Sequence, residues 1–268
     1  MELESSYASI RSQGLGLVAV SYDPVEVLKS FADRKKITFP MLSDPGSKII
    51  RSYGILNDTV EKGNMAYGIP YPGTYVLDAK GVIVSKYFED DYKERETASS
   101  ILVQQFGAPA GGAHVTKQSK QLQVSLSAST DTIATGQHVS LVLDIDLKPK
   151  MHVYAPGVEH YIPIEWQMAE SDAAKFEAVK WPKSEKLYLQ AIDETVPVYK
   201  DTFRAVRDIV FAPDGKLKSL VNEKGEITIH GTLKYQACDD KMCFVPVSVP
   251  LDWTFHYSAL DRQRFQKK

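Results

Sequence analysis

The sequence predicts two domains of different fold class, an α/β domain followed by an all-β sandwich. Its 268 residues exceed the usual size of one domain. Residues 1–107 mix helical and strand-like hydrophobic patterns, whereas residues 122–258 carry almost only the alternating pattern of strands. Residues 108–121 are small, polar and aperiodic, which is typical of a flexible linker. Residues 259–268 form a polar tail.

The first domain is predicted to alternate helices and strands before ending in a hairpin and a helix. Apolar spacing and turn residues mark each element. The expected elements are a helix around 3–10, a strand over 15–20, a helix begun by Asp23 and Pro24, a strand over 38–42, a helix from Asp44 to Gly54, a hairpin of 74–77 with 82–88, and a helix over 91–106. Such an order is typical of helices layered on a sheet.

The second domain is predicted to be an antiparallel sandwich. Apolar residues recur at every second position in four segments, and turn-rich spacers separate these segments. The segments are Val124–Ala128, Val139–Ile145, Ile227–Leu233 and Val247–Trp253.

Composition excludes several classes of function. The net charge is −2 and basic residues are scattered, so we expect neither nucleic acid nor an anionic membrane as a partner. No apolar run has the ~20 residues of a membrane helix. The N-terminus lacks the features of a signal peptide, which taken literally indicates the cytoplasm. No HxxxH or CxxC pattern occurs, so we expect no metal and no other cofactor.

The cysteine pair is the strongest chemical signal. Cys238 and Cys243 are separated by four residues that suit a hairpin turn. Opposed residues of an antiparallel pair have Cα atoms ~4.5–5.5 Å apart, a distance that a disulfide tolerates. A structural hairpin disulfide is one interpretation. A redox-active pair is favoured, because a loop this short contributes only about 2 kcal/mol by loop closure.

Three motifs of the first domain resemble the redoxin family of peroxiredoxin and TlpA-like thioredoxin-fold proteins. They are Gly14-Leu-Gly-Leu-Val-Ala-Val-Ser-Tyr-Asp-Pro, Phe39-Pro-Met-Leu-Ser-Asp-Pro-Gly and Ile69-Pro-Tyr-Pro-Gly-Thr-Tyr-Val-Leu-Asp. The resemblance implies a thioredoxin-like α/β domain, and it matches Pro72 to the family's cis-proline beside the active site. The alternative for Pro72 is an ordinary strand start.

The reactive cysteine of that family has no counterpart before Cys238. Two explanations stay open: an N-terminal truncation that removes the first strand, or a degenerate binding module. We favour truncation, because a sheet without its central strand exposes two unpaired edges. Peroxidase activity is not expected from this chain, since it requires a reactive thiol in this domain.

The segment Tyr235-Gln-Ala-Cys-Asp-Asp-Lys-Met-Cys-Phe-Val-Pro, with Lys150-Met-His-Val-Tyr-Ala, resembles the N-terminal domain of the thiol:disulfide interchange protein DsbD. The resemblance implies an immunoglobulin-like sandwich in the periplasm. It implies that Cys238 and Cys243 are the redox pair and that Tyr154, and with a weaker match His152, line it. A capping loop is expected within residues 186–196. The family commonly separates its cysteines by five residues rather than four.

Together these observations predict a thiol–disulfide oxidoreductase that acts in cell redox homeostasis or periplasmic thiol reduction. Its expected partners are redox proteins, either thioredoxin-like domains or a DsbD-like membrane electron donor. The alternative is a non-catalytic protein-binding module with a structural disulfide and a degenerate redoxin domain. The sequence leaves open the direction of electron flow and which cysteine attacks.

Overall fold

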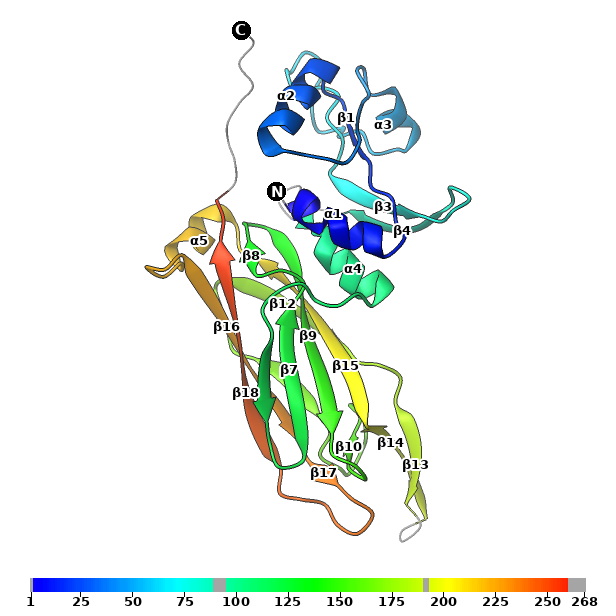
Figure 1. Cartoon of the computed structure of the whole chain (residues 1–268), viewed down its shortest axis with the longest axis vertical. Helices are drawn as coiled ribbons and strands as arrows, with labels where there is room; N and C mark the ends of the chain where they lie inside the picture. Colours follow the sequence, from blue (N-terminus) through cyan, green and yellow to red (C-terminus); the bar gives the residue numbers. More distant parts are fainter. Residues whose placement is uncertain (1, 89–94, 190–192, 260–268) are drawn as a thin grey trace. The chain divides into compact units, whose positions relative to one another are not determined.

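The computed structural model describes residues 2–88, 95–189 and 193–259. The described chain divides into two compact units, residues 1–108 and 109–259, which we describe separately (Figure 1).

The first unit contains four helices and five strands within the described residues. They are α1 (Glu2–Ser12), β1 (Ala19–Ser21), α2 (Val25–Lys35), β2 (Met41–Ser43), α3 (Lys48–Ser52), β3 (Gly73–Leu77), β4 (Ile83–Phe88), β5 (Arg95–Glu96) and α4 (Ala98–Phe106). β1 pairs in parallel with β2, and β3 pairs antiparallel with β4. These are two separate two-stranded sheets in the described part of the chain, and apolar side chains such as Val20, Leu42 and Val84 stay exposed.

Local hydrogen bonds decide where the helices of this unit begin. The buried Asp44 carboxylate accepts hydrogen bonds from the backbone N–H of Lys48 and of Ile50, which secures the first turn of α3. α4 begins later than the predicted residue 91, because the Thr97 side chain accepts from Ser100 N and caps the helix there. Residues 91–94 of the predicted helix lie outside the described residues.

The second unit is built almost entirely of strands. They are β6 (Val115–Gln118), β7 (Leu122–Ala128), β8 (Thr132–Ile133), β9 (Gln137–Leu147), β10 (His152–Tyr154), β11 (Glu165–Met168), β12 (Ala174–Lys180), β13 (Glu185–Leu189), β14 (Glu194–Lys200), β15 (Thr202–Phe211), β16 (Glu226–Tyr235), β17 (Ala237–Cys238) and β18 (Val247–Tyr257); a short helix, α5 (Asp214–Ser219), follows β15.

Two large sheets of this unit enclose the main core. One has the strand order β12-β15-β9-β7-β6 and the other β11-β16-β18-β8. Their alternating apolar residues face one another, so Leu143, Ile209, Leu233 and Leu251 are fully buried in one cluster. The unit is therefore a β-sandwich, as the sequence predicts.

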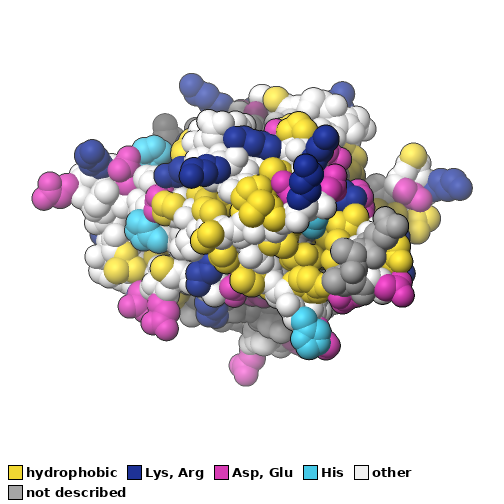
Figure 2. All heavy atoms as spheres, turned by 90° about the horizontal axis from the view of Figure 1, so that it is seen from below, with side chains coloured by type: hydrophobic (Ala, Val, Ile, Leu, Met, Phe, Trp, Pro, Cys, Tyr) yellow, Lys and Arg dark blue, Asp and Glu magenta, His cyan; other side chains and the backbone are white. Residues whose placement is uncertain are grey.

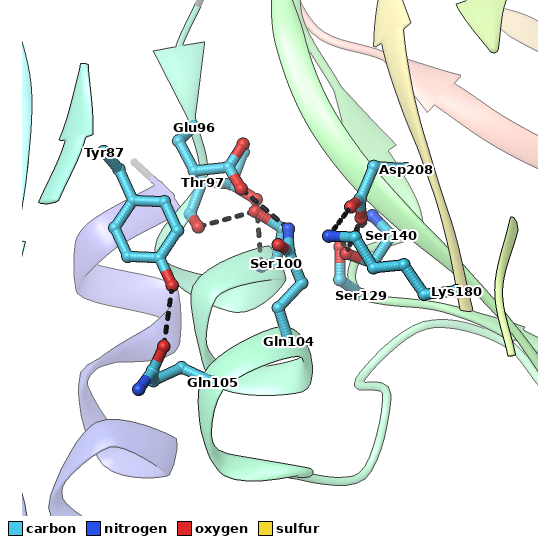
Figure 3. A network of polar contacts seen from close by, with 10 residues as sticks. All are labelled: Tyr87, Glu96, Thr97, Ser100, Gln104, Gln105, Ser129, Ser140, Lys180 and Asp208. Atoms are coloured by element: carbon cyan, nitrogen blue, oxygen red, sulfur yellow. Dashed lines mark hydrogen bonds and ion pairs between the residues drawn. The ribbon is translucent and has the colours of Figure 1, made fainter. Parts of the chain in front are cut away.

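A buried polar network ties three strands of one sheet together. Ser140 of β9 is fully buried and donates a 2.6 Å hydrogen bond to Asp208 of β15, whose other carboxylate oxygen lies 2.6 Å from Lys180 Nζ at the end of β12 (Figure 3). Ser140 N also donates to Ser129 Oγ. The Asp208 carboxylate is thus paired on both oxygens, as a buried charge requires.

Part of the segment that the sequence assigns to the linker is a strand. Residues 115–118 form β6, which pairs antiparallel with β7. Ser119 Oγ lies 2.6 Å from Tyr235 Oη, a further tie between this segment and the sandwich. Residues 115–118 form a strand because their backbone pairs with that of β7. The pattern of hydrophobic residues in the sequence does not reveal pairing of this kind.

A third sheet completes the second unit. Its strand order is β13-β14-β10-β17, and Figure 1 shows these strands together at one end of the unit. This sheet positions the two cysteines.

Candidate functional site

Cys238 and Cys243 form a disulfide across a tight turn. Cys238 ends β17, and the two residues make an isolated antiparallel bridge. Backbone hydrogen bonds from Phe244 N to Ala237 O and from Asp239 N to Met242 O flank the pair. This arrangement is that of a non-hydrogen-bonded pair, in which the two strands approach most closely. The Cα atoms are 4.0 Å apart, closer than the sequence-based expectation.

Asp239 organises the turn between the cysteines. Its Oδ1 accepts hydrogen bonds of 2.8 Å from the backbone N–H of both Lys241 and Met242. These two hydrogen bonds, more than the charges of Lys241 and His152, hold the pKa of Asp239 below its ordinary value against a smaller effect of burial. The turn is therefore secured by a carboxylate that stays ionised at neutral pH.

The two sulfur-bearing residues differ in exposure. Cys238 is only 1% exposed and belongs to a buried cluster with Tyr154, Val196 and Val198. Cys243, in contrast, is exposed. A reagent from solvent therefore reaches the Cys243 side of the bond first.

The short strand β10 places two side chains beside the disulfide. In its pairing with β17, His152 is opposite Cys238. Side chains alternate along a strand, so His152 and Tyr154 share the face of Cys238, while Val153 enters the main core. The structure thus brings together four residues that the sequence singled out: Cys238, Cys243, Tyr154 and His152.

Tyr154 directs its hydroxyl at the outer sulfur. The distance from Tyr154 Oη to Cys243 Sγ is 3.8 Å, and the hydroxyl is the donor because a disulfide sulfur carries no hydrogen. Burial raises the pKa of Tyr154, and the charge of Glu194 raises it further. The hydroxyl therefore keeps its proton at neutral pH.

Tyr161 and Glu194 hold Tyr154 in place, and sequence reasoning missed both. The Tyr161 ring stacks on the Tyr154 ring at 4.3 Å, and its hydroxyl donates a 2.6 Å hydrogen bond to Glu194 Oε2. This hydrogen bond, with smaller effects of burial and charge, raises the pKa of Tyr161 to about 12. Tyr161 lies in a loop and Glu194 begins β14, 33 residues further on, so no sequence pattern indicates that the two side chains meet.

The β13–β14 hairpin occupies the region where a capping loop was expected. Leu187 and Leu189 of β13 pack against the cluster that contains Cys238. The residues between the two strands, 190–192, lie outside the described residues. The hairpin thus contributes an apolar wall beside the disulfide.

Exposed apolar side chains adjoin the exposed cysteine in the sequence. Figure 2, which views this end of the second unit, shows hydrophobic side chains gathered near its centre with Lys and Arg side chains beside them. Met242 and Val245, one and two residues away from Cys243, are large exposed apolar side chains, and Val245 is 83% exposed. A surface of this kind suits contact with another protein.

The cis-proline expectation for Pro72 is wrong. No peptide bond in the described residues is cis, so Pro72 follows a trans bond. It directly precedes β3, where its missing N–H removes no ladder hydrogen bond. Pro72 belongs to the first unit, whereas the disulfide belongs to the second.

In the described residues, no three His, Cys, Asp or Glu side chains lie together in a group that could hold a metal ion. Within the same residues, no helix is both long and apolar enough to cross a membrane.

Comparison with known families assigns both parts of the chain. Residues 1–86 match the AhpC/TSA family, and residues 119–250 match the N-terminal domain of thiol:disulfide interchange protein DsbD. The chain joins an AhpC/TSA redoxin domain to a DsbD N-terminal domain. The redoxin domain is thioredoxin-like and the DsbD N-terminal domain is an immunoglobulin-like sandwich, so the predicted fold classes are confirmed.

Individual relatives match the redoxin domain. Chloroplastic peroxiredoxin Q of Sedum lineare is 34% identical over 82 residues, which are 31% of this chain and 41% of that protein. Alkyl hydroperoxide reductase C of Staphylococcus aureus is 26% identical over 102 residues, 37% of this chain and 50% of the relative. The chain thus spans about half the length of the curated relatives that it matches.

Among solved structures, the N-terminal periplasmic domain of ScsB from Proteus mirabilis is similar to part of this chain. The superposition includes 55% of this chain and 51% of the ScsB chain, with a TM-score of 0.36 and 16% sequence identity. The two family matches and the Cys238–Cys243 disulfide together support a thiol–disulfide redox function.

Proposed function

We propose that this chain is a thiol–disulfide oxidoreductase that exchanges electrons with partner proteins through Cys238 and Cys243. The unequal exposure of the two cysteines carries the proposal, because one end of the bond faces solvent and the other is enclosed. An exposed sulfur accepts an attacking thiolate, and an enclosed one is protected from uncontrolled exchange.

The exchange proceeds in two balanced steps. A partner thiolate bonds to Cys243 Sγ, the disulfide breaks, and the electron pair stays on Cys238. The partner's second thiolate then bonds to the partner sulfur of the mixed disulfide and releases Cys243. The partner is oxidised to a disulfide and its two electrons end on this chain, whose two thiolates take up protons from solvent. The reverse sequence oxidises Cys238 and Cys243.

The alternative is a binding module with a structural disulfide. Closing a loop of this length stabilises a fold by only about 2 kcal/mol. The second unit already encloses a large apolar core, to which Cys238 does not belong. The position of the disulfide at the unit's end therefore favours exchange over stabilisation.

Thioredoxin-like redox proteins are the proposed partners, with a DsbD-like membrane electron donor as the source of electrons in the reducing direction. Met242 and Val245, exposed apolar side chains next to Cys243 in the sequence, supply a contact surface. The periplasm is the proposed compartment, because disulfides persist in oxidising environments. Within it we propose a role in cell redox homeostasis or in periplasmic thiol reduction.

Equilibration of the full chain with glutathione buffers tests the proposal. We expect a reduction potential above about −300 mV, the level below which disulfides resist the glutathione pool. The Cys238→Ser variant should form a stable mixed disulfide with a thioredoxin-like partner through Cys243, whereas the Cys243→Ser variant should form much less. A potential below that level, with no mixed disulfide, would leave the binding module as the function.

A further inference from the structure

A buried histidine lies beside the sulfur that leaves in the first exchange step. His152 of β10 is opposite Cys238 of β17 in the antiparallel pairing. Directly opposed residues on one face of a sheet have Cβ atoms about 4.5–5.5 Å apart. The imidazole is therefore a direct neighbour of the Cys238 side chain.

One ring nitrogen of His152 has no hydrogen-bond partner. The residue is 4% exposed, and its Nε2 is buried and unpaired in the described structure, which contains the disulfide. Buried polar side-chain atoms are in most cases paired, so an exception next to a redox pair requires a reason. A disulfide sulfur is a weak acceptor, whereas a thiolate is a strong one.

We propose that His152 is a positioning residue for disulfide exchange, whose Nε2–H donates a hydrogen bond to the Cys238 sulfur once the disulfide opens. This inference rests on the exchange function proposed above. When a partner thiolate bonds to Cys243 Sγ, the electron pair of the broken bond stays on Cys238 as a thiolate. A buried thiolate is disfavoured unless a donor faces it, and His152 supplies that donor. The thiolate is protonated from solvent afterwards.

Ionisable groups from three elements face His152. Lys200 of β14 is its cross-strand neighbour, and Asp239 and Asp240 come from the turn after β17. Tyr154, on the same strand as His152, presents its ring at 5.6 Å, edge to face. Burial lowers the pKa of His152, the charge of Lys200 lowers it further, and the two aspartates oppose this. The ring is therefore neutral at neutral pH and carries one N–H donor.

Two measurements on His152→Phe in the full chain test the inference. The first is the rate of disulfide reduction by dithiothreitol, which we expect to fall roughly tenfold to a hundredfold, the value of one hydrogen bond to a charged group. The second is the pKa of the Cys238 thiol, followed by thiolate absorbance in a Cys243→Ser background. We expect His152→Phe to raise this pKa.

Matched variants separate hydrogen bonding from packing. His152→Gln keeps a side-chain N–H and should recover most of the rate and of the Cys238 pKa. His152→Leu should behave like His152→Phe and replaces it if the phenyl ring prevents folding. His138→Gln changes a half-buried histidine of β9 and should leave both readouts unchanged.

Each outcome decides the inference. A wild-type disulfide that exchanges, together with an unchanged rate and Cys238 pKa in His152→Phe, overturns the role of His152 and leaves the proposed function standing. Equal losses in the Gln and Phe variants without a pKa change indicate packing and also overturn it. A wild-type disulfide that resists reduction overturns the proposed function and this inference together.

Discussion

The hydroxyl of Tyr154 is a hydrogen-bond donor aimed at a sulfur that has no proton of its own. The 3.8 Å contact with Cys243 Sγ is weak while the disulfide is closed. It strengthens when Cys243 becomes a thiolate, because a charged acceptor attracts an O–H donor more strongly. The tyrosine therefore favours the reduced state.

We predict that Tyr154→Phe makes the disulfide harder to reduce. The loss of one hydrogen bond, about 0.5–1.5 kcal/mol, corresponds to a roughly two- to tenfold change in the exchange equilibrium with glutathione. Because burial and Glu194 raise the pKa of Tyr154 above its ordinary 10.0, the hydroxyl stays protonated up to that pH. Thiols ordinarily ionise at about pH 8.5, so the ratio of wild type to variant should grow from about pH 6 to 9 as Cys243 becomes the thiolate that this donor stabilises. A ratio of one across the whole range would contradict a hydrogen bond from Tyr154 to the reduced sulfur.

The sequence reveals a site residue when a short motif contains it or when a family resemblance points to it. Cys238 and Cys243 are conspicuous because they are close together and are the only cysteines of the chain. Tyr154 and His152 come from the DsbD resemblance. Tyr161 and Glu194 escape prediction because the folded backbone alone brings a loop residue to the start of β14.

At the scale of elements, the turn between the cysteines depends on one side chain. Asp239 accepts both backbone hydrogen bonds that close it, and this lowers the pKa of Asp239. A carboxyl whose pKa is lowered in the folded state stabilises that state above its ordinary pKa, here 3.8, and loses this effect as the pH falls through the lower folded-state value.

We predict that Asp239→Ala loosens the turn. Hydrogen exchange at the amides of Lys241 and Met242 should be severalfold faster at neutral pH, while Asp239→Asn, which keeps the acceptor oxygen, should retain protection. The difference between wild type and the Ala variant should persist down to pH about 4 and shrink below it. The neighbouring Asp240→Ala serves as the control, and equal exchange in both Ala variants would refute the role of Asp239.

The predicted elements fail where backbone pairing decides the outcome. Residues 115–118 look like linker because few of them are apolar, yet their backbone pairs with β7. α4 starts at Ala98 rather than at the predicted residue 91. The Thr97 side chain caps the helix there, and the apolar pattern that predicted the helix does not show this cap. The large strands β9, β16 and β18 are predicted well because one face of each is buried along its length.

The buried network of the sandwich offers a test at the same scale. Ser140→Ala leaves Asp208 Oδ1 without its 2.6 Å donor, so we predict a loss of about 1–3 kcal/mol in the free energy of unfolding. Lys180→Met removes the cation beside Asp208, whose side chain is only 9% exposed, so its loss should be at least as large as that of Ser140→Ala. Urea unfolding of both variants measures the two losses, and a negligible loss for Lys180→Met would be inconsistent with this network.

At the scale of the whole molecule, the cysteine pair and its surroundings lie in one unit. The described second unit, residues 109–259, contains both the main core and the cluster around Cys238. The first unit carries exposed apolar strand residues and no cysteine.

We predict that residues 109–259 expressed alone fold and keep the reduction potential of the full chain. The enclosed core supplies the stability, and each residue around the disulfide is present. Circular dichroism and glutathione equilibration provide the two readouts. A folded fragment whose potential differs from that of the full chain would show that the first unit acts on the disulfide.

The unequal exposure of the cysteines also determines how the site withstands oxidants. In the reduced protein we expect a peroxide to reach Cys243 first and convert it to a sulfenic acid, because burial shields Cys238. The Cα atoms of the pair are 4.0 Å apart, so the enclosed thiol condenses with the sulfenic acid and releases water. We therefore expect the sulfenic acid to return to the disulfide before it is oxidised to the irreversible sulfinic and sulfonic acids, with the buried Cys238 as the resolving thiol.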